Sequence, residues 1–322
     1  MIGRDLMIPF TVSPLGYVGP ENAMFFSGSC FGEAMHRAAK YSGFESFYGP
    51  CGIVFNPLAM ATGFKRMLEL HYYGADELIR MGSLYHSHDH HSVFSGTDVP
   101  QVLEGINQQL LLGFEAIKRS EVLVISFGTA WYYRLADSGR IVSNNHRRPA
   151  ADFIKELATA DRIAADWASL LLRILELNPK LKICLAVSPV KYLRDGLVEH
   201  SRSKAVLISA VHALCELVPE TYYFPSFELL VDVLRDYRWY DADMAHPSEQ
   251  AEALIWHHFS ETWMNQQARK MIQEVTQYRR LQSHKIRFPD TPESIAFQQQ
   301  KDLFREKLIA EYPHLKKPSV GF

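Results

Sequence analysis

Phe25-Phe26-Ser27-Gly28-Ser29-Cys30-Phe31-Gly32 runs from an apolar stretch through a glycine into a segment with the pattern of a helix. A short apolar run that ends at a glycine is typical of a strand buried on both faces of a parallel sheet. Glycine permits a tight turn, and the helix that follows offers free N–H groups and the positive end of its dipole. A thiol or hydroxyl at this turn is a candidate nucleophile. The alternative is that Ser29 only caps the helix and Cys30 is a small buried residue.

The same pattern recurs along the chain. Short apolar runs that end at small or turn residues predict five strands, at Met24–Ser27, Phe44–Tyr48, Val122–Phe127, Ile183–Val187 and Thr221–Phe224. Helical patterns follow at Glu33–Tyr41, Pro57–His71, Val102–Lys118, Ala151–Leu177, Ser201–Leu217, Ser248–Tyr278 and Pro292–Ala310. This alternation predicts an α/β fold, a three-layer α/β/α sandwich around a central parallel sheet of about five strands. Ligands of such sheets bind beyond the carboxyl ends of the strands.

We expect one α/β domain over residues 1–278, because no linker or repeat interrupts the alternation. Residues 71–100 lack a clear period and are interpreted as an insertion, which in a compact domain is often functional or mobile. The charged, helical residues 279–322 are interpreted as a C-terminal appendage packed on this domain or extending from it.

Composition restricts the class of protein. The chain has 322 residues, 47% of them hydrophobic, and a formal net charge of −2, so it can bury a sizeable core and no global field draws it to nucleic acid or an anionic membrane. Apolar runs fall far short of the roughly 20 residues that span a bilayer, and residues 1–22 are broken by glycine and proline. The four cysteines form no CxxC motif. We therefore expect a cytoplasmic protein, and no pattern indicates its oligomeric state.

A second candidate site is Asp241-Ala242-Asp243-Met244-Ala245-His246-Pro247-Ser248. Pro247 cannot continue a preceding helix but can begin one, which places His246 at a junction between loop and helix. Asp243 precedes His246 by three residues and could bind one imidazole nitrogen, leaving the other to act as a base. The alternative is that Asp243 caps a turn and His246 is an ordinary surface residue.

Beyond these two sites the sequence resembles the GSCFA family, named after its N-terminal motif. The resemblance extends over roughly residues 10–259 and has one departure, Gly32, where the family name has alanine. It is carried, after Gly28–Gly32, by Gly52-Ile53-Val54-Phe55-Asn56-Pro57, His91-Ser92 with Phe94-Ser95, Phe127–Ala130, Ser188-Pro189-Val190, Tyr223–Glu228 and Asp243-x-x-His246-Pro247-Ser248.

The resemblance implies an SGNH/GDSL-hydrolase fold, which is flavodoxin-like, and a nucleophile that works with a D-x-x-H pair. It places Cys30 at the nucleophile position, keeps Ser29 as the alternative, and matches Asp243 and His246 to the pair. The asparagine that normally supplies an oxyanion donor is missing, because the motif here reads Gly128-Thr129-Ala130. We expect Asn56, Gly52 or Gly128 to substitute, since an oxyanion hole needs only donors aimed at the developing charge.

The most polar tract is Tyr85-His86-Ser87-His88-Asp89-His90-His91. Imidazoles can bind zinc or nickel, but no spacing of the H-E-x-x-H type occurs. We therefore expect no metal, with His91 and Ser92 at the rim of the cleft as the family pattern implies, and the neighbouring histidines solvated. Arg147 and Arg148 could hold an anionic group, although the favoured interpretation is a solvated loop.

The leading hypothesis is an ester hydrolase or acyltransferase that acts on a small or carbohydrate O-acyl ester through Cys30 or Ser29, His246 and Asp243. A second hypothesis is an inactive SGNH-fold module that binds a glycan or peptide. A third is a metal-dependent hydrolase that uses the His86–His91 tract. No phosphate-binding loop or dinucleotide motif occurs, so no cofactor is expected.

Overall fold

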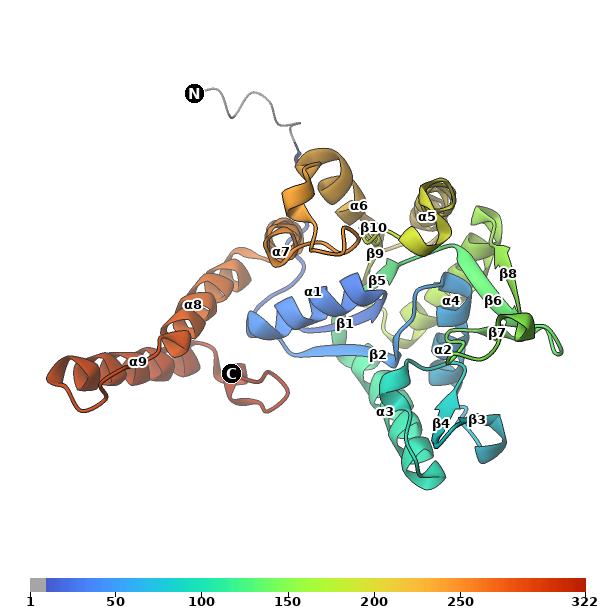
Figure 1. Ribbon diagram of the computed structural model, residues 1–322. Coiled ribbons are helices and arrows are strands. Elements are labelled where there is room, and N and C mark those ends of the chain that lie inside the picture. Colours follow the sequence, from blue (N-terminus) through green and yellow to red (C-terminus); the bar gives the residue numbers. More distant parts are fainter. Residues whose placement is uncertain (1–9) are drawn as a thin grey trace.

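The computed structural model describes residues 10–322. Its centre is a sheet of five parallel strands in the order β10-β9-β5-β1-β2, which confirms the α/β fold with a central parallel sheet (Figure 1). The strands are β1 (Ala23–Gly28), β2 (Ser46–Ile53), β5 (Ser120–Phe127), β9 (Lys182–Val187) and β10 (Thr221–Phe224). The chain moves outward from β1 to β2 and then returns to β5 on the other side of β1. The carboxyl ends of β1 and β5 therefore form the switch point, where a ligand crevice is expected.

Helices cover both faces of the sheet and give three layers. They are α1 (Cys30–Tyr41), α2 (Pro57–Glu69), α3 (Val99–Arg119), α4 (Ala160–Leu177), α5 (Leu197–Leu217), α6 (Ser226–Glu228), α7 (Glu249–Trp263), α8 (Gln266–Ser283) and α9 (Pro292–Glu311). Alternate residues of each strand point to opposite faces. Phe25 therefore joins the core under α2, α3, α4 and α5, whereas Phe26 joins the core under α1, α7 and α8. Each short apolar run thus contributes side chains to two hydrophobic cores, one on each face of the sheet.

Strand β2 continues through Gly49-Pro50, where the sequence was expected to turn. It is the edge strand of the sheet, so Pro50 interrupts no ladder on its outer side. Gly49 packs so closely on Ser27 that an added Cβ would lie 2.5 Å from the Ser27 Oγ. The register between β1 and β2 shifts at this place, between Phe26 and Gly28.

The predicted bounds of two helices were wrong. The first third of the expected helix Ala151–Leu177 contains strand β8 (Phe153–Leu157), and the helix starts only at Ala160, capped by Thr159. The expected helix Ser248–Tyr278 is divided between α7 and α8, because the Asn265 side chain caps a new helix by accepting from the Ala268 N–H at 2.9 Å.

Two small antiparallel sheets stand beside the main one. The insertion at 71–100 contains the hairpin β3 (Leu78–Met81) and β4 (Leu84–Ser87). The other sheet has the order β7-β6-β8, with β6 (Trp131–Leu135) and β7 (Ile141–Val142) joined by a turn in which Gly139 has φ +71°. Both sheets lie on the α2 and α4 side of the molecule (Figure 1).

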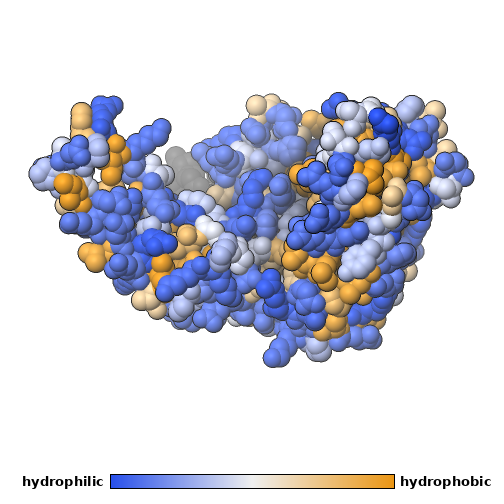
Figure 2. All heavy atoms as spheres, turned by 90° about the horizontal axis from the view of Figure 1, so that it is seen from below, coloured by the Kyte–Doolittle hydropathy of each residue, from blue (hydrophilic) through white to orange (hydrophobic). Residues whose placement is uncertain are grey.

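Helices α8 and α9 project from the body as an arm, and the chain then returns toward α1 (Figure 1). The returning segment is anchored by Leu315, which is buried, and by the His314 ring, which lies 3.2 Å from the Gly43 oxygen. Figure 2 shows the molecule from below, with hydrophilic residues over most of this face and a hollow between arm and body. No helix within residues 10–322 combines the length and apolarity needed to cross a bilayer.

Candidate active site

The turn after β1 is fixed by a close approach of two backbones. Gly28 has φ +133°, and a Cβ on it would lie 2.1 Å from the Ser126 oxygen in β5. No residue with a side chain fits there. The Ser29 N–H donates to that Ser126 oxygen at 3.1 Å, and the Tyr48 hydroxyl donates to the Gly28 oxygen at 2.7 Å. The turn is therefore held from both neighbouring strands.

Ser29 and Cys30 face different surroundings. Ser29 occupies the N-cap position of α1, but its side chain makes no capping hydrogen bond. Its hydroxyl is buried and lies 3.1 Å from the Ser126 hydroxyl. Cys30 is the first residue of α1 and lines a cavity of about 340 Å³. The two candidate nucleophiles are thus separated, and Cys30 is the one that borders open space.

His246 lines the same cavity as Cys30, although more than 200 residues separate them in the sequence. The other lining residues are Phe31, Glu33, Arg37, Val190, Asp241, Pro247, Glu249 and Glu252. Within the described residues no hydrogen bond joins the Cys30 thiol to the His246 ring. The fold therefore brings the two groups to one cavity without a hydrogen bond between them.

Asp243 holds the His246 ring. Its Oδ2 lies 2.6 Å from the Nδ1 of His246, and its Oδ1 accepts the main-chain N–H groups of Ala245 and His246 at 2.9 and 3.0 Å. These bonds to the carboxylate lower the pKa of Asp243 to about 2. Nδ1 is occupied, so Nε2 is the nitrogen free for chemistry.

The Cys30 thiol is protonated at rest. Burial raises the pKa of Cys30, and this outweighs the N–H groups of Phe31 and Cys30 and the charge of Lys204, which all lower it. A base is therefore needed before this thiol can act as a nucleophile.

Lys204 is a buried cation that the sequence did not reveal. It is only 2% exposed, and its Nζ donates to the main-chain oxygens of Gly128 at 2.8 Å and Ser188 at 2.6 Å. These oxygens directly follow β5 and β9, so one ammonium group joins two strand ends. Burial lowers the pKa of Lys204 to about 7. In the sequence it is one lysine of an ordinary helical pattern, and only tertiary packing makes it unusual.

The expected oxyanion donors are already engaged. The Asn56 amide nitrogen donates to the Trp131 oxygen at 3.1 Å, and its Oδ1 caps α2 by accepting from the Leu58 N–H at 2.8 Å. The Gly128 N–H donates to the Phe55 oxygen at 2.9 Å. Neither group points free into the Cys30 cavity, whereas the first-turn N–H groups of α1 lie at Cys30 itself.

Gly52, His91 and Ser92 lie away from Cys30. Gly52 has φ +72°, and a Cβ on it would lie 2.9 Å from the Cβ of His91, which explains the glycine. His91 lines a second cavity, of about 560 Å³, together with Phe55 and Asn56. Ser92 is exposed and borders neither cavity.

The histidines before His91 are buried, so the expectation that they are solvated was wrong. His88 and His90 are 2% and 1% exposed. The Nδ1 of His88 lies 2.9 Å from the Asn144 oxygen, and the Nδ1 of His90 lies 2.8 Å from the Ser87 hydroxyl. Among residues 10–322, no three His, Cys, Asp or Glu side chains converge as metal ligands would. This geometry removes the support for a metal centre in the tract.

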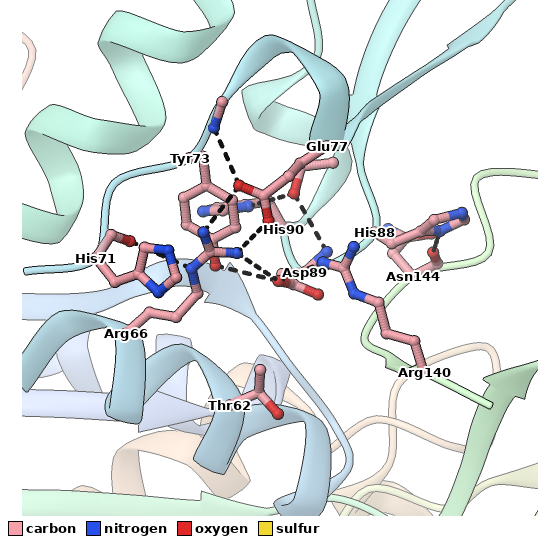
Figure 3. Close-up of polar contacts among 12 residues, drawn as sticks. Thr62, Arg66, His71, Tyr73, Glu77, His88, Asp89, His90, Arg140 and Asn144 are labelled. Carbon is pink, nitrogen blue, oxygen red and sulfur yellow. Dashed lines mark hydrogen bonds and ion pairs between the residues drawn. The ribbon is translucent and has the colours of Figure 1, made fainter. Parts of the chain in front are cut away.

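Asp89, within the histidine tract, joins the tract to neighbouring elements (Figure 3). Its Oδ2 accepts from Arg140 at 2.8 Å and from the Tyr73 hydroxyl at 3.2 Å, and it lies 3.9 Å from the Arg66 Nη1. Arg66 belongs to α2 and also binds Glu77 at 2.8 Å. The buried carboxylate therefore ties the insertion to α2 and to the β6–β7 turn.

The sequence of this chain matches a known protein family. The model of the GSCFA family matches residues 23–259, which include the β1 turn and the Asp243–His246 loop. The chain belongs to the GSCFA family. At the position of the family's alanine, a Cβ on Gly32 would lie 3.2 Å from the Ser27 oxygen, a close fit that needs a small adjustment.

Three of the solved structures that are similar to this GSCFA chain are described as carbohydrate esterases. One is an acetyl xylan esterase (Est2A) from the rumen bacterium Butyrivibrio proteoclasticus, with 10% identity, a TM-score of 0.37, and coverage of 75% of this chain and 63% of that one. Another is a carbohydrate esterase family 2 enzyme of Corynascus thermopiles (Myceliophthora fergusii), with 10% identity, a TM-score of 0.36, and coverage of 82% and 68%.

A third is a carbohydrate esterase family 3 protein from Talaromyces cellulolyticus, with 10% identity, a TM-score of 0.29, and coverage of 80% and 99%. The GSCFA chain thus spans less than two thirds of the length of the Butyrivibrio enzyme. Scores this low bear on neither activity nor substrate. A comparison with curated protein sequences gives no match.

Proposed function

We propose that this GSCFA protein is an acyl-ester hydrolase or acyltransferase in which Cys30 is the nucleophile, His246 the base and Asp243 the residue that orients the base. The observation that carries the proposal is that Cys30, at the N-terminus of α1, and the Asp243-held His246 line one cavity. The same helix end supplies N–H groups where an oxyanion would develop.

In the proposed reaction the Nε2 of His246 takes the thiol proton, and the Cys30 sulfur attacks the ester carbonyl carbon. The carbonyl oxygen gains negative charge and accepts the N–H groups of Cys30 and Phe31. Collapse of this intermediate breaks the bond to the alcohol oxygen, which takes the proton from His246 and leaves as the alcohol. A water, or a second alcohol, then gives its proton to His246 and attacks the thioester. Collapse of the second intermediate breaks the carbon–sulfur bond and releases the acid or the new ester, and the sulfur takes the proton back from His246, which restores the thiol and the neutral imidazole.

We propose a carbohydrate as the alcohol part of the ester. The 560 Å³ cavity beside the site is lined by aromatic rings, among them Trp131 and Tyr192, together with hydrogen-bonding side chains such as Asn145. Its size is typical of small-molecule sites, which also combine apolar walls with a few polar groups.

Turnover of p-nitrophenyl acetate tests the proposal. We expect Cys30→Ala and His246→Gln to lose activity by at least about 100-fold, as removal of a nucleophile or base does. Ser29→Ala is the matched control and should retain it, because the Ser29 hydroxyl faces Ser126. Equal activity in the parent and in Cys30→Ala would refute the mechanism.

A second candidate function is a binding module without turnover. It is favoured by the pKa of Cys30, which burial raises, and by the lack of a hydrogen bond between that thiol and His246 among the described residues. Alkylation by iodoacetamide, located by mass spectrometry because Cys215 is also partly exposed, separates the two functions. Labelling of Cys30 that His246→Gln slows supports an enzyme, and labelling that this change leaves untouched supports a binder.

A further inference from the structure

The 560 Å³ cavity carries an excess of positive charge. Arg147, Arg148 and Arg194 all line it, and the carboxylate among the lining residues is Asp195. Asp195 is paired with Lys155, and Arg148 is paired with Asp152 at 2.9 Å. Among the described residues, no carboxylate lies within ion-pair distance of Arg147 or Arg194. Two guanidinium groups are therefore available to a ligand.

The loop that presents Arg147 is held in a strained conformation. His146 and Arg147 both have positive φ, +47° and +61°, although neither is glycine. A positive φ is unfavourable for a residue with a side chain and persists only where the surrounding structure imposes it. Here the buried histidine tract imposes it, because the His88 oxygen accepts the N–H groups of Ser143 and Asn144 at 2.9 and 3.0 Å. The His146 Nε2 also lies 2.7 Å from the Ser87 oxygen.

Tyr192 connects this cavity to the nucleophile. It lines the cavity and packs edge-to-face on Phe55, with ring centroids 5.7 Å apart. Burial raises the pKa of Tyr192, and the nearby Cys30 adds to the effect. Two residues earlier in the same loop, Val190 lines the cavity of Cys30. Residues of one loop therefore line both cavities.

We propose that this cavity binds an anionic group, so that the substrate of the site is the ester of an acidic carbohydrate. Guanidinium groups bind planar carboxylates and phosphates through paired, charge-assisted hydrogen bonds. Arg147 and Arg194 hold the anion, and the aromatic walls, including Trp131 and Tyr192, contact the sugar ring. The inference rests on the proposed function, because it treats the cavity as the part of the substrate site that holds the alcohol.

Calorimetric titration of the full chain with three probes tests this: glucuronic acid, glucose 6-phosphate and glucose. We expect at least one charged probe to bind tenfold or more tightly than glucose, and the better one identifies carboxylate or phosphate. The double substitution Arg147→Gln and Arg194→Gln should weaken that binding at least tenfold. Arg305→Gln is the matched control, because Arg305 is exposed on α9, outside the cavity.

Equal binding of glucose and the charged probes overturns the inference, and so does unchanged binding in the double variant. Both arginines are replaced by polar residues, and a matching thermal midpoint for parent and variant shows that the variant folds. Cys30→Ala should bind the charged probe as the parent does, since the probes carry no ester. If the charged probe binds but the protein does not turn over the ester, the proposed enzyme is rejected and the anion site is kept. If the protein turns over the ester but the charged probe does not bind, the anion site is rejected and the proposed enzyme is kept.

Discussion

The ammonium nitrogen of Lys204 lies 2.6 Å from the main-chain oxygen of Ser188, in the interior of the protein. We expect Lys204→Met to leave this oxygen and that of Gly128 without a donor, which costs about 1–3 kcal/mol for each group. Chemical denaturation at about pH 6, where most Lys204 side chains carry their proton, measures this loss against the parent. An unchanged unfolding free energy would contradict a stabilising role of the two hydrogen bonds.

The pH dependence of stability gives Lys204 a second test. Its pKa is about 7 in the folded protein and 10.5 in its ordinary state, so between these values the unfolded chain binds more protons. Unfolding free energy of the parent, relative to Lys204→Met, should rise with pH across this window. Lys65→Met, at an exposed position on α2, is the control. A flat difference would contradict the buried, partly neutral lysine.

Asp243→Asn should slow ester turnover by roughly 100- to 10,000-fold, because the ring of His246 loses the acceptor that fixes its tautomer and its orientation. Steady-state kinetics with p-nitrophenyl acetate measure the effect. Asp241→Asn provides a matched control, since Asp241 lines the same cavity but makes no side-chain contact with the ring. An equal loss in both variants would indicate a general change in cavity charge instead.

Gly28→Ala should prevent the turn from forming, since its Cβ would lie 2.1 Å from the Ser126 oxygen. We expect a loss of at least about 4 kcal/mol in unfolding free energy or no folded protein, an effect at the extreme of single substitutions. Gly105→Ala in helix α3 is the control, because a Cβ there meets open space. It should stabilise the protein by about 0.5–1 kcal/mol. Chemical denaturation measures both.

Acid should destabilise the protein through its buried histidines. Burial lowers the pKa of His90 to about 3 and of His146 to about 4, so below pH 6.5 the unfolded chain binds protons that the folded chain does not. Stability is therefore lost as pH falls from about 6.5 toward 4. His146→Gln should flatten this dependence, whereas His212→Gln, at an exposed position, should not. Urea denaturation at pH 7 and at pH 4.5 measures the difference.

The central sheet was predictable because its strands are buried on both faces, which leaves short, continuous apolar runs. Strand β8 was missed because Phe153–Leu157 pairs only with β6 and carries exposed, charged residues that also suit a helix. The break between α7 and α8 depends on one cap, Asn265, inside a long amphipathic pattern.

In the candidate site, the resemblance to the GSCFA family was what paired Cys30 with His246, and the structure places both residues on one cavity. The sequence did not reveal Lys204, because a lysine in a helix is normally solvated and only the packing of α5 against the strand ends buries it. The histidine tract was misjudged for the opposite reason. Polar residues predict exposure, yet here main-chain oxygens and hydroxyl groups satisfy them in the interior.

The distance along the chain between Cys30 and His246 has a consequence for biosynthesis. A ribosome makes the cysteine long before it makes the imidazole that is proposed to take its proton. Throughout that interval the thiol has no partner base. Folding buries this cysteine and raises its pKa, so a fall in its reactivity toward a soft electrophile would report that the turn has formed, and a pulse of such a reagent during synthesis could time that event.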